Sequence, residues 1–187
     1  MGRVRPWRVQ ARERVADCRI FSVERTIVRS PKDGAEHDFY RILSDDWVQI
    51  VPVTASGEVV MIRQYRVGAE HATLEIPGGI VDPGETPAAA ASRELLEETG
   101  YAAARLVPLG DLNPNPALFS NRLHCFVAEG AAPVGEIRND RAEETIVELV
   151  PLDELPRLLV EGAVDHGLVV ATLWRYLHWS RSADARR

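Results

Sequence analysis

The sequence predicts an α/β protein with a small β-strand lobe at its N-terminal end. Three observations predict this class: β-rich segments dominate the first 67 residues, an alanine-rich segment with clear end signals covers 87–99, and residues 168–179 show the apolar spacing of a helix. The predicted organisation is a β lobe over residues 1–45, a main domain over 46–180 and a polar tail over 181–187.

The β-rich segments alternate apolar and polar residues. In the lobe, RIFSVERTIVRS and FYRILS flank PKDGAEHD, whose Asp-Gly pair favours a turn, so we expect a hairpin. WVQIVPVTASGEVVMIRQYRV predicts two further strands that turn at Ser56 and Gly57, and TLEIPGG predicts a strand that ends at Pro77. Later strands are expected at RLVPLGDL, RLHCFVAEG and ETIVELVPL.

Composition and charge exclude several classes of protein. The chain of 187 residues is 45% apolar and 27% charged, and its two cysteines, Cys18 and Cys125, suggest neither a disulfide framework nor a zinc site. No apolar run approaches the roughly 20 residues of a membrane span, and no signal peptide is recognised. A net charge of −6 without a basic stripe argues against nucleic-acid binding. We therefore expect a cytoplasmic protein that binds neither membranes nor nucleic acid.

The alanine-rich segment has signals for both ends of a helix. Thr86 suits the N-cap, Pro87 suits the first helical position, and Gly100 suits the position that follows the last turn. Three residues are expected to anchor the helix in a core: Ala88, Ala91 and Leu95.

Three carboxylates share one sector of this helix. At about 100° per residue, Glu98 lies about 40° from Glu94, and Glu97 lies about 60° away on the other side. A solvated acidic face is the simple interpretation. However, acidic side chains are unfavourable in the last turn of a helix and repel each other at i,i+4. Divalent cations would remove this cost, and Arg93 is placed to orient Glu97 while the other two carboxylates stay free for metal.

The segment around this helix resembles the Nudix box. That pattern is Gly, five residues, Glu, seven residues, then Arg-Glu-apolar-any-Glu-Glu-any-Gly-apolar, and every position is filled here: Gly79, Glu85, Arg93, Glu94, Leu95, Glu97, Glu98, Gly100 and Tyr101. The resemblance implies an α/β/α sandwich around a mixed β-sheet. It also implies a Nudix hydrolase that cleaves a nucleoside diphosphate linked to another group.

The resemblance also implies roles for individual residues. Glu94, Glu97 and Glu98 would bind Mg²⁺ or Mn²⁺, with the backbone carbonyl of Gly78 completing the metal site. Two further residues would act mainly by orienting the loop and the helix: Glu85 and Arg93. The simple alternative for Glu85 is a turn residue whose charge favours the start of a helix.

Other segments resemble the subgroup of ADP-ribose and nucleoside-diphosphate-sugar pyrophosphatases. Pro116 lies sixteen residues after Gly100, as in that subgroup, and RQYR and LEIPGG precede the box. The substrate-binding candidates are Arg63, Gln64 and Arg66 for phosphate or ribose, Glu75 for metal or sugar, and Phe119 for stacking on a base. Solvent-facing strand polarity is the alternative for the polar candidates, and ordinary core packing is the alternative for Phe119.

The residues after Pro116 depart from the ADP-ribose pattern. Ala117 to Arg122 stand where a glycine and an acidic residue are expected, which leaves a broader range of nucleotide sugars open. In this subgroup a glutamate on a loop ahead of a late strand activates water. Glu143 and Glu144 stand at the corresponding position, and the match to the apolar residues of the strand that follows favours Glu144. A solvated acidic loop is the alternative.

The N-terminal strands resemble the lobe that this subgroup exchanges across a homodimer, so we expect a homodimer with a small nucleotide-sugar substrate. Two other functions remain open from the sequence. One is a Nudix hydrolase of dinucleoside polyphosphates or coenzyme A, and the other is a non-catalytic module that senses nucleotides.

Overall fold

The computed structural model describes residues 3–139 and 143–184. The chain divides into two compact units. The first contains the described residues up to Asp45 together with Asn113–Arg122, and the second contains Asp46–Leu112 and the described residues from Leu123 onward. The loop 113–122, which the sequence assigned to the main domain, therefore groups with the N-terminal strands.

The first unit is built on an antiparallel sheet. Its described strands are β1 (Arg8–Asp17), β2 (Ser22–Arg29) and β3 (Glu36–Leu43), and they pair in the order β1-β2-β3. The expected hairpin is confirmed as β2 and β3, and β1 is a further strand of the predicted β lobe whose position was not specified from the sequence. Loop 113–122 joins this unit through hydrogen bonds from the Ile42 amide to the Leu118 carbonyl and from the Ser120 amide to the Ile42 carbonyl.

The second unit contains a mixed sheet of eight strands among the residues described. β10 pairs in parallel with β4, and the other strand pairs are antiparallel. The main path of the sheet is β11-β5-β4-β10-β8. Its strands are β4 (Trp47–Thr54), β5 (Glu58–Arg66), β6 (His71–Glu75), β7 (Gly78–Ile80), β8 (Tyr101–Ala102), β9 (Arg105–Leu112), β10 (Leu123–Pro133) and β11 (Thr145–Pro151).

Helix α1 (Pro87–Thr99) has the ends that the sequence predicts. The Thr86 side chain accepts a hydrogen bond from the Ala89 amide at 3.2 Å. At the other end Gly100 has a φ of 73°, a conformation that strains residues with a side chain, and its amide donates to the Leu96 carbonyl.

Two more helices follow β11. α2 (Leu155–Glu161) was not predicted, although Pro156 near its start and Gly162 after its end are the usual signals. α3 (Gly167–Asp184) confirms the closing helix and continues through residues 181–184 of the predicted tail. No helix among the residues described is long and apolar enough to cross a membrane.

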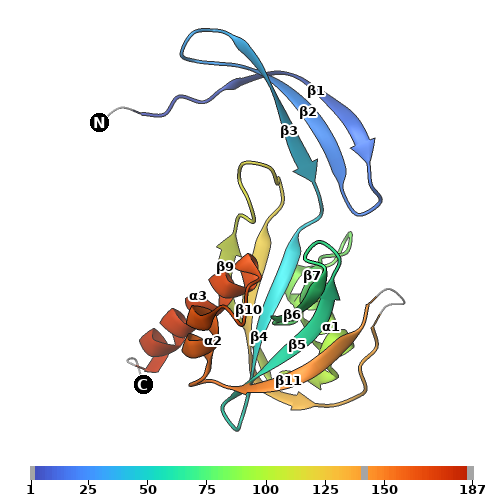
Figure 1. The fold of residues 1–187 in the computed structure, drawn as a ribbon, viewed down its shortest axis with the longest axis vertical. Coiled ribbons are helices and arrows are strands. Elements are labelled where there is room, and N and C mark those ends of the chain that lie inside the picture. Colours follow the sequence, from blue (N-terminus) through green and yellow to red (C-terminus); the bar gives the residue numbers. More distant parts are fainter. Residues whose placement is uncertain (1–2, 140–142, 185–187) are drawn as a thin grey trace. The chain divides into compact units, whose positions relative to one another are not determined.

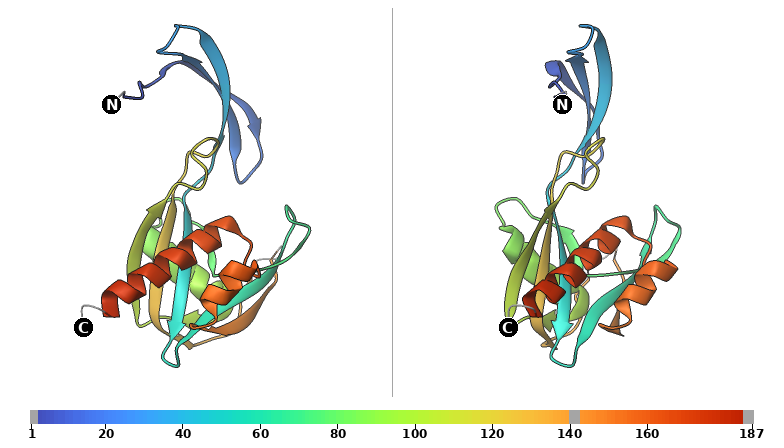
Figure 2. Two further views of the ribbon diagram at one scale, coloured as in Figure 1. Left: turned by 60° about the vertical axis from the view of Figure 1, so that its left-hand side comes forward. Right: turned by 90° about the vertical axis from the view of Figure 1, so that its left-hand side faces the viewer.

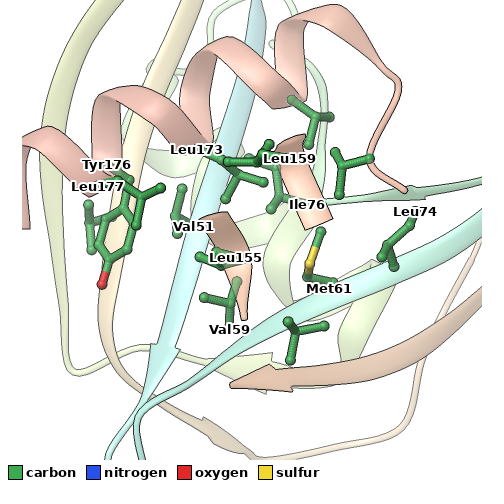
Figure 3. Close-up of a cluster of buried hydrophobic side chains, with 14 residues drawn as sticks. Val51, Val59, Met61, Leu74, Ile76, Leu155, Leu159, Leu173, Tyr176 and Leu177 are labelled. Carbon is green, nitrogen blue, oxygen red and sulfur yellow. The ribbon is translucent and has the colours of Figure 1, made fainter. Parts of the chain in front are cut away.

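The second unit is an α/β/α sandwich, as the resemblance implied (Figure 1). Figure 2 shows α1 on one face of the sheet and α2 and α3 on the other. One core cluster joins the sheet to α2 and α3 through residues such as Val51, Met61 and Leu173 (Figure 3). The other core cluster joins the sheet to α1, where Ala91 and Leu95 are buried as expected. Ala88 is exposed, contrary to expectation, because Ala90 takes its place in the core.

Candidate active site

The candidate site forms where β7 meets α1. Both glycines of β7 allow close contacts that a side chain would prevent. A Cβ on Gly78 would lie 2.3 Å from the Val48 carbonyl oxygen, and one on Gly79 would lie 2.3 Å from Glu94 Oε1. Glycine is therefore required here if the strand and the helix carboxylates are to lie this close together.

Arg93 connects the loop before α1 to the carboxylates on it. Its Nε and Nη2 donate to the two carboxylate oxygens of Glu85, at 3.2 and 2.9 Å, and Nη2 also donates to the Ile80 carbonyl. Its Nη1 lies 2.8 Å from Glu94 Oε1 and 3.1 Å from Glu97 Oε2. Arg93 thus contacts Glu94 as well as Glu97, whereas the sequence predicts that Glu94 is free for metal.

Glu98 is the most buried of the three helix carboxylates. The residue is 4% exposed, and its Oε2 accepts a hydrogen bond of 2.8 Å from the Gly78 amide. Burial raises the pKa of Glu98 to about 8, and the charges of Glu94 and Glu143 act in the same direction. The Gly78 amide and the Arg66 guanidinium oppose this shift without cancelling it.

The other two carboxylates differ in exposure. The Glu94 side chain is 12% exposed and the Glu97 side chain is 44% exposed. Burial raises the pKa of Glu94 although Arg93 acts against it. A fully solvated acidic face does not describe these side chains. Within the described ranges, no three His, Cys, Asp or Glu side chains are already arranged to hold a metal ion.

Arg66 and Glu75 form a bidentate ion pair on the face of the sheet that α1 covers. Nε and Nη2 of Arg66 each lie 2.8 Å from a carboxylate oxygen of Glu75, and the Thr73 hydroxyl donates to Oε1 at 2.6 Å. Burial by itself raises the pKa of Glu75, but the hydrogen bonds from Arg66 and Thr73 hold it below its usual range. The charge of Arg66 also acts on Glu98, so the two groups belong to one region.

The structure separates Arg63 from this region. Side chains alternate between the two faces along a strand, so Arg63 shares a face with Met61, which packs toward α2 and α3. There it forms an ion pair of 2.9 Å with Glu148. Gln64 has the opposite orientation and is buried on the same face as Arg66, with Thr145 as its register partner on β11.

The two candidate bases precede β11. Both Glu143 and Glu144 are exposed. The charge of Glu143 raises the pKa values of Glu94 and Glu98, which indicates that its carboxylate is close to them. Pro116 and Phe119 lie in loop 113–122 of the first unit, where Phe119 forms an isolated bridge with Ile42.

Two site threonines were not recognised in the sequence. Thr73 stands two residues before Glu75, and this spacing places both side chains on one face of a strand. The contact between them could therefore have been predicted from the sequence. Thr145 donates its hydroxyl hydrogen to the Glu98 carbonyl at 2.7 Å. No local pattern marks this second contact, because 47 residues separate the two partners.

The chain is similar to known proteins over most of its length. The NUDIX domain model matches residues 45–173. The ADP-ribose pyrophosphatase of Bacillus subtilis is 32% identical over 75% of this chain and 76% of its own length. The ADP compounds hydrolase NudE of Escherichia coli is 31% identical over 89% of both chains.

A solved structure extends the similarity to nearly the whole chain. The crystal structure of an ADP compounds hydrolase has a TM-score of 0.87 and 28% identity, and the match covers 98% of each chain. Because the domain model spans well over half of the sequence and the relatives align over most of their length, this chain belongs to the Nudix family and is a pyrophosphohydrolase that resembles the ADP-ribose pyrophosphatases.

Proposed function

We propose that the protein hydrolyses the pyrophosphate bond of ADP-ribose or a related nucleoside diphosphate sugar in a reaction that requires Mg²⁺ or Mn²⁺. The products would be a nucleoside monophosphate and a sugar phosphate. Relatives named for ADP-ribose and for ADP compounds support an ADP-linked substrate. The range of sugars stays broad in this proposal, because residues 117–122 depart from the ADP-ribose pattern.

The observation that carries the proposal is the burial of Glu98 beside Glu94 at the glycine-lined edge of β7. Glu98 accepts a hydrogen bond from a backbone amide and pairs with no arginine or lysine among the interactions described, so its ionised form is poorly balanced without a cation. Carboxylate oxygens are the donors that hard divalent cations prefer. The residues present therefore fit a divalent cation, and Glu94, Glu97, Glu98 and the carbonyl of Gly78 would hold it.

The chain's own groups divide the remaining work. A bound divalent cation would neutralise charge on the pyrophosphate and lower the pKa of water. Arg93 holds the loop in place through its contact with Glu85, and it holds Glu94 through a separate hydrogen bond from Nη1. We assign Arg66, which Glu75 orients, to binding the substrate phosphates, and Gln64 to the same region. Because Arg63 faces the other side of the sheet, we assign it to the ion pair with Glu148.

We assign proton transfer to Glu143. A general base must lie within reach of the attacking water, and Glu143 is the candidate whose charge acts on Glu94, Glu98 and Arg66. The sequence pattern favoured Glu144, and the effect of the Glu143 charge on Glu94 and Glu98 is our reason for proposing Glu143 instead. Residues 140–142, just before these glutamates, lie outside the described structure.

Two features of the whole protein belong to the same proposal. The first unit would serve homodimerisation, with loop 113–122 contributing Pro116 and Phe119 to a nucleotide site completed in the dimer.

The proposed location is the cytoplasm. The cysteines Cys18 and Cys125 are both free, and free thiols suit this reducing compartment.

The reaction is tested by measuring turnover with MgCl₂ on ADP-ribose, ADP-glucose, GDP-mannose, UDP-glucose, diadenosine polyphosphate and coenzyme A. AMP with ribose 5-phosphate, or another nucleoside monophosphate with a sugar phosphate, is expected. Activity on the last two substrates alone would move the protein to another branch of the family. No turnover together with tight nucleotide binding would indicate a sensor.

Replacing Glu98 by glutamine tests the metal site. Glu98→Gln is expected to fold normally and to lower kcat by at least ~10³, the scale of losing a key electrostatic group. Mg²⁺ should raise the melting temperature of the wild type, because a ligand that binds only the folded state stabilises it, and the variant should lose this response. Glu161→Gln, at an exposed position of α2, is the control and should keep both properties. A fully active Glu98→Gln variant would refute the assignment.

A further inference from the structure

We propose that Thr145 is a positioning residue, which sets Glu143 against the carboxylates of α1 by donating its hydroxyl hydrogen to the backbone carbonyl of Glu98. The inference rests on the proposed function only in that it takes Glu143 as the base. The contact itself is a buried hydrogen bond of 2.7 Å between β11 and the last turn of α1.

The end of α1 offers backbone acceptors to this part of the chain. The last four carbonyl groups of a helix have no partner within the helix. Here the Glu97 carbonyl accepts from the Arg138 amide at 2.8 Å, and the Glu98 carbonyl accepts from Thr145. The Gly100 carbonyl accepts from the amides of Val134 and Gly135 at 2.8 and 3.1 Å. The described parts of segment 134–145 therefore follow the end of the helix that carries the metal-binding candidates.

Gly100 makes this close approach possible. A Cβ at this position would lie 2.4 Å from the Gly135 carbonyl oxygen, a distance that real Cβ atoms do not show. The glycine that ends α1 thus also admits segment 134–139 to the end of the helix.

The Thr145 hydroxyl joins both sides of this segment. The residue is 6% exposed, and its Oγ1 lies 3.0 Å from Asn139 Oδ1 as well as 2.7 Å from the Glu98 carbonyl oxygen. Asn139 and Thr145 stand on opposite sides of residues 140–142. The hydroxyl has one hydrogen, which it donates to the Glu98 carbonyl at the shorter distance, and the same oxygen lies beside Asn139 on the other side of the segment.

Thr145 is also fixed by the sheet. It is the first residue of β11 and pairs with Gln64 of β5. The strand register thus fixes the position of the Thr145 backbone, and the hydrogen bond to α1 fixes its side chain. Glu143 lies only two residues earlier in the chain. Because the acceptor carbonyl and the buried carboxylate both belong to Glu98, the hydrogen bond couples the position of the base directly to a metal-binding candidate.

Three variants separate positioning from the ordinary loss of a buried hydroxyl. Thr145→Val keeps the side-chain shape and removes the donor, and Thr145→Ser keeps the donor. Thr172→Val is the matched control, because Thr172 is also buried and its hydroxyl donates to Gln49 Oε1 at 2.7 Å in the core. We expect Thr145→Val to lower kcat about 10- to 100-fold with little change in KM, the scale of a small misplacement of a reacting group. Thr145→Ser should recover most of the loss, and Thr172→Val should retain wild-type kcat.

A double-mutant cycle tests whether Thr145 acts through Glu143. In a Glu143→Gln background, Thr145→Val should lower kcat no further, because the group that it positions is already disabled. Equal losses in the two backgrounds would overturn the inference, as would wild-type kcat in Thr145→Val. Wild-type kcat in Glu143→Gln alone would overturn both the base and its positioning.

Amide hydrogen exchange gives a readout that does not depend on activity. Thr145→Val should speed the exchange of the Arg138 amide, which donates to the neighbouring Glu97 carbonyl, while Thr172→Val should not. A wild type that hydrolyses none of the substrates would refute the proposed function, and faster exchange would still confirm the link. Unchanged exchange in Thr145→Val would refute the link even in an active enzyme.

Discussion

At the scale of single residues, the site depends on the missing side chain of a glycine as much as on charged groups. Gly79 lets Glu94 approach β7, since even one methyl group would overlap its carboxylate. The closest atoms to that methyl group are the end of a flexible side chain, which can move away. Adding the methyl group should therefore displace Glu94 while leaving the backbone nearly unchanged.

Gly79→Ala is expected to lower kcat/KM by about 10²-fold, because a displacement of about 1 Å at a reacting centre has an effect of this size. The urea midpoint should change little. Gly68→Ala is the control, since a Cβ there meets no atom within 4 Å. Wild-type kcat/KM in Gly79→Ala would show that the position of Glu94 does not matter for the reaction.

At the scale of elements, a histidine on β10 contacts β9 and the residue that precedes β4. The two ring nitrogens of His124 lie 3.1 Å from Asp46 Oδ2 and 2.9 Å from Asp111 Oδ1. Partial burial lowers the pKa of His124, but the two carboxylates outweigh this effect and raise it above its usual value. The protonated ring can donate to both carboxylates at once, and the neutral ring can donate to only one of them.

The His124 cluster should make stability depend on pH. A histidine whose pKa is raised in the folded state contributes stability that is fully present below its unfolded pKa of about 6.5. That contribution is lost as the pH rises through the folded pKa. The difference in unfolding free energy between wild type and His124→Gln should therefore be largest near pH 6 and shrink above it. Urea unfolding between pH 5.5 and 9 measures this difference, and His178→Gln, on the exposed side of α3, is the control. A difference independent of pH would exclude the ion pairs as its source.

At the scale of the whole molecule, the first unit offers an apolar surface suited to the proposed homodimer. One face of its sheet holds a hollow of about 420 Å³, whose apolar lining is Trp7, Val9, Val28 and Phe39 and whose polar lining is Arg12, Thr26 and Arg41. The rings of Trp7 and Phe39 meet edge to face with centroids 5.8 Å apart, yet both side chains are substantially exposed. Exposed apolar patches of this kind are typical of interaction sites.

Phe39→Glu should weaken the homodimer at least ~10²-fold, because the dimer would have to bury an unpaired charge. Tyr40→Glu is the matched control, since Tyr40 is the next residue of β3, is similarly exposed and points to the opposite face. Sedimentation velocity over a range of concentrations measures both variants. A wild type that remains monomeric would refute the dimer, and dissociation caused only by Tyr40→Glu would place the interface on the other face.

Features that depend on neighbouring residues could be predicted from the sequence alone. The caps of α1, the turn at Gly57 and the spacing of the acidic residues involve groups within a few positions of each other, so their pattern is visible in the chain. The same locality gave the Nudix box and hence the family.

Other features could be seen only in the folded protein. They are the face of the sheet on which Arg63 and Arg66 each lie, the grouping of loop 113–122 with the first unit and the burial of Glu98. Folding also brings Thr145 to the end of α1. These features depend on strand register and on packing between distant segments, where a shift of one residue exchanges the two faces of a strand.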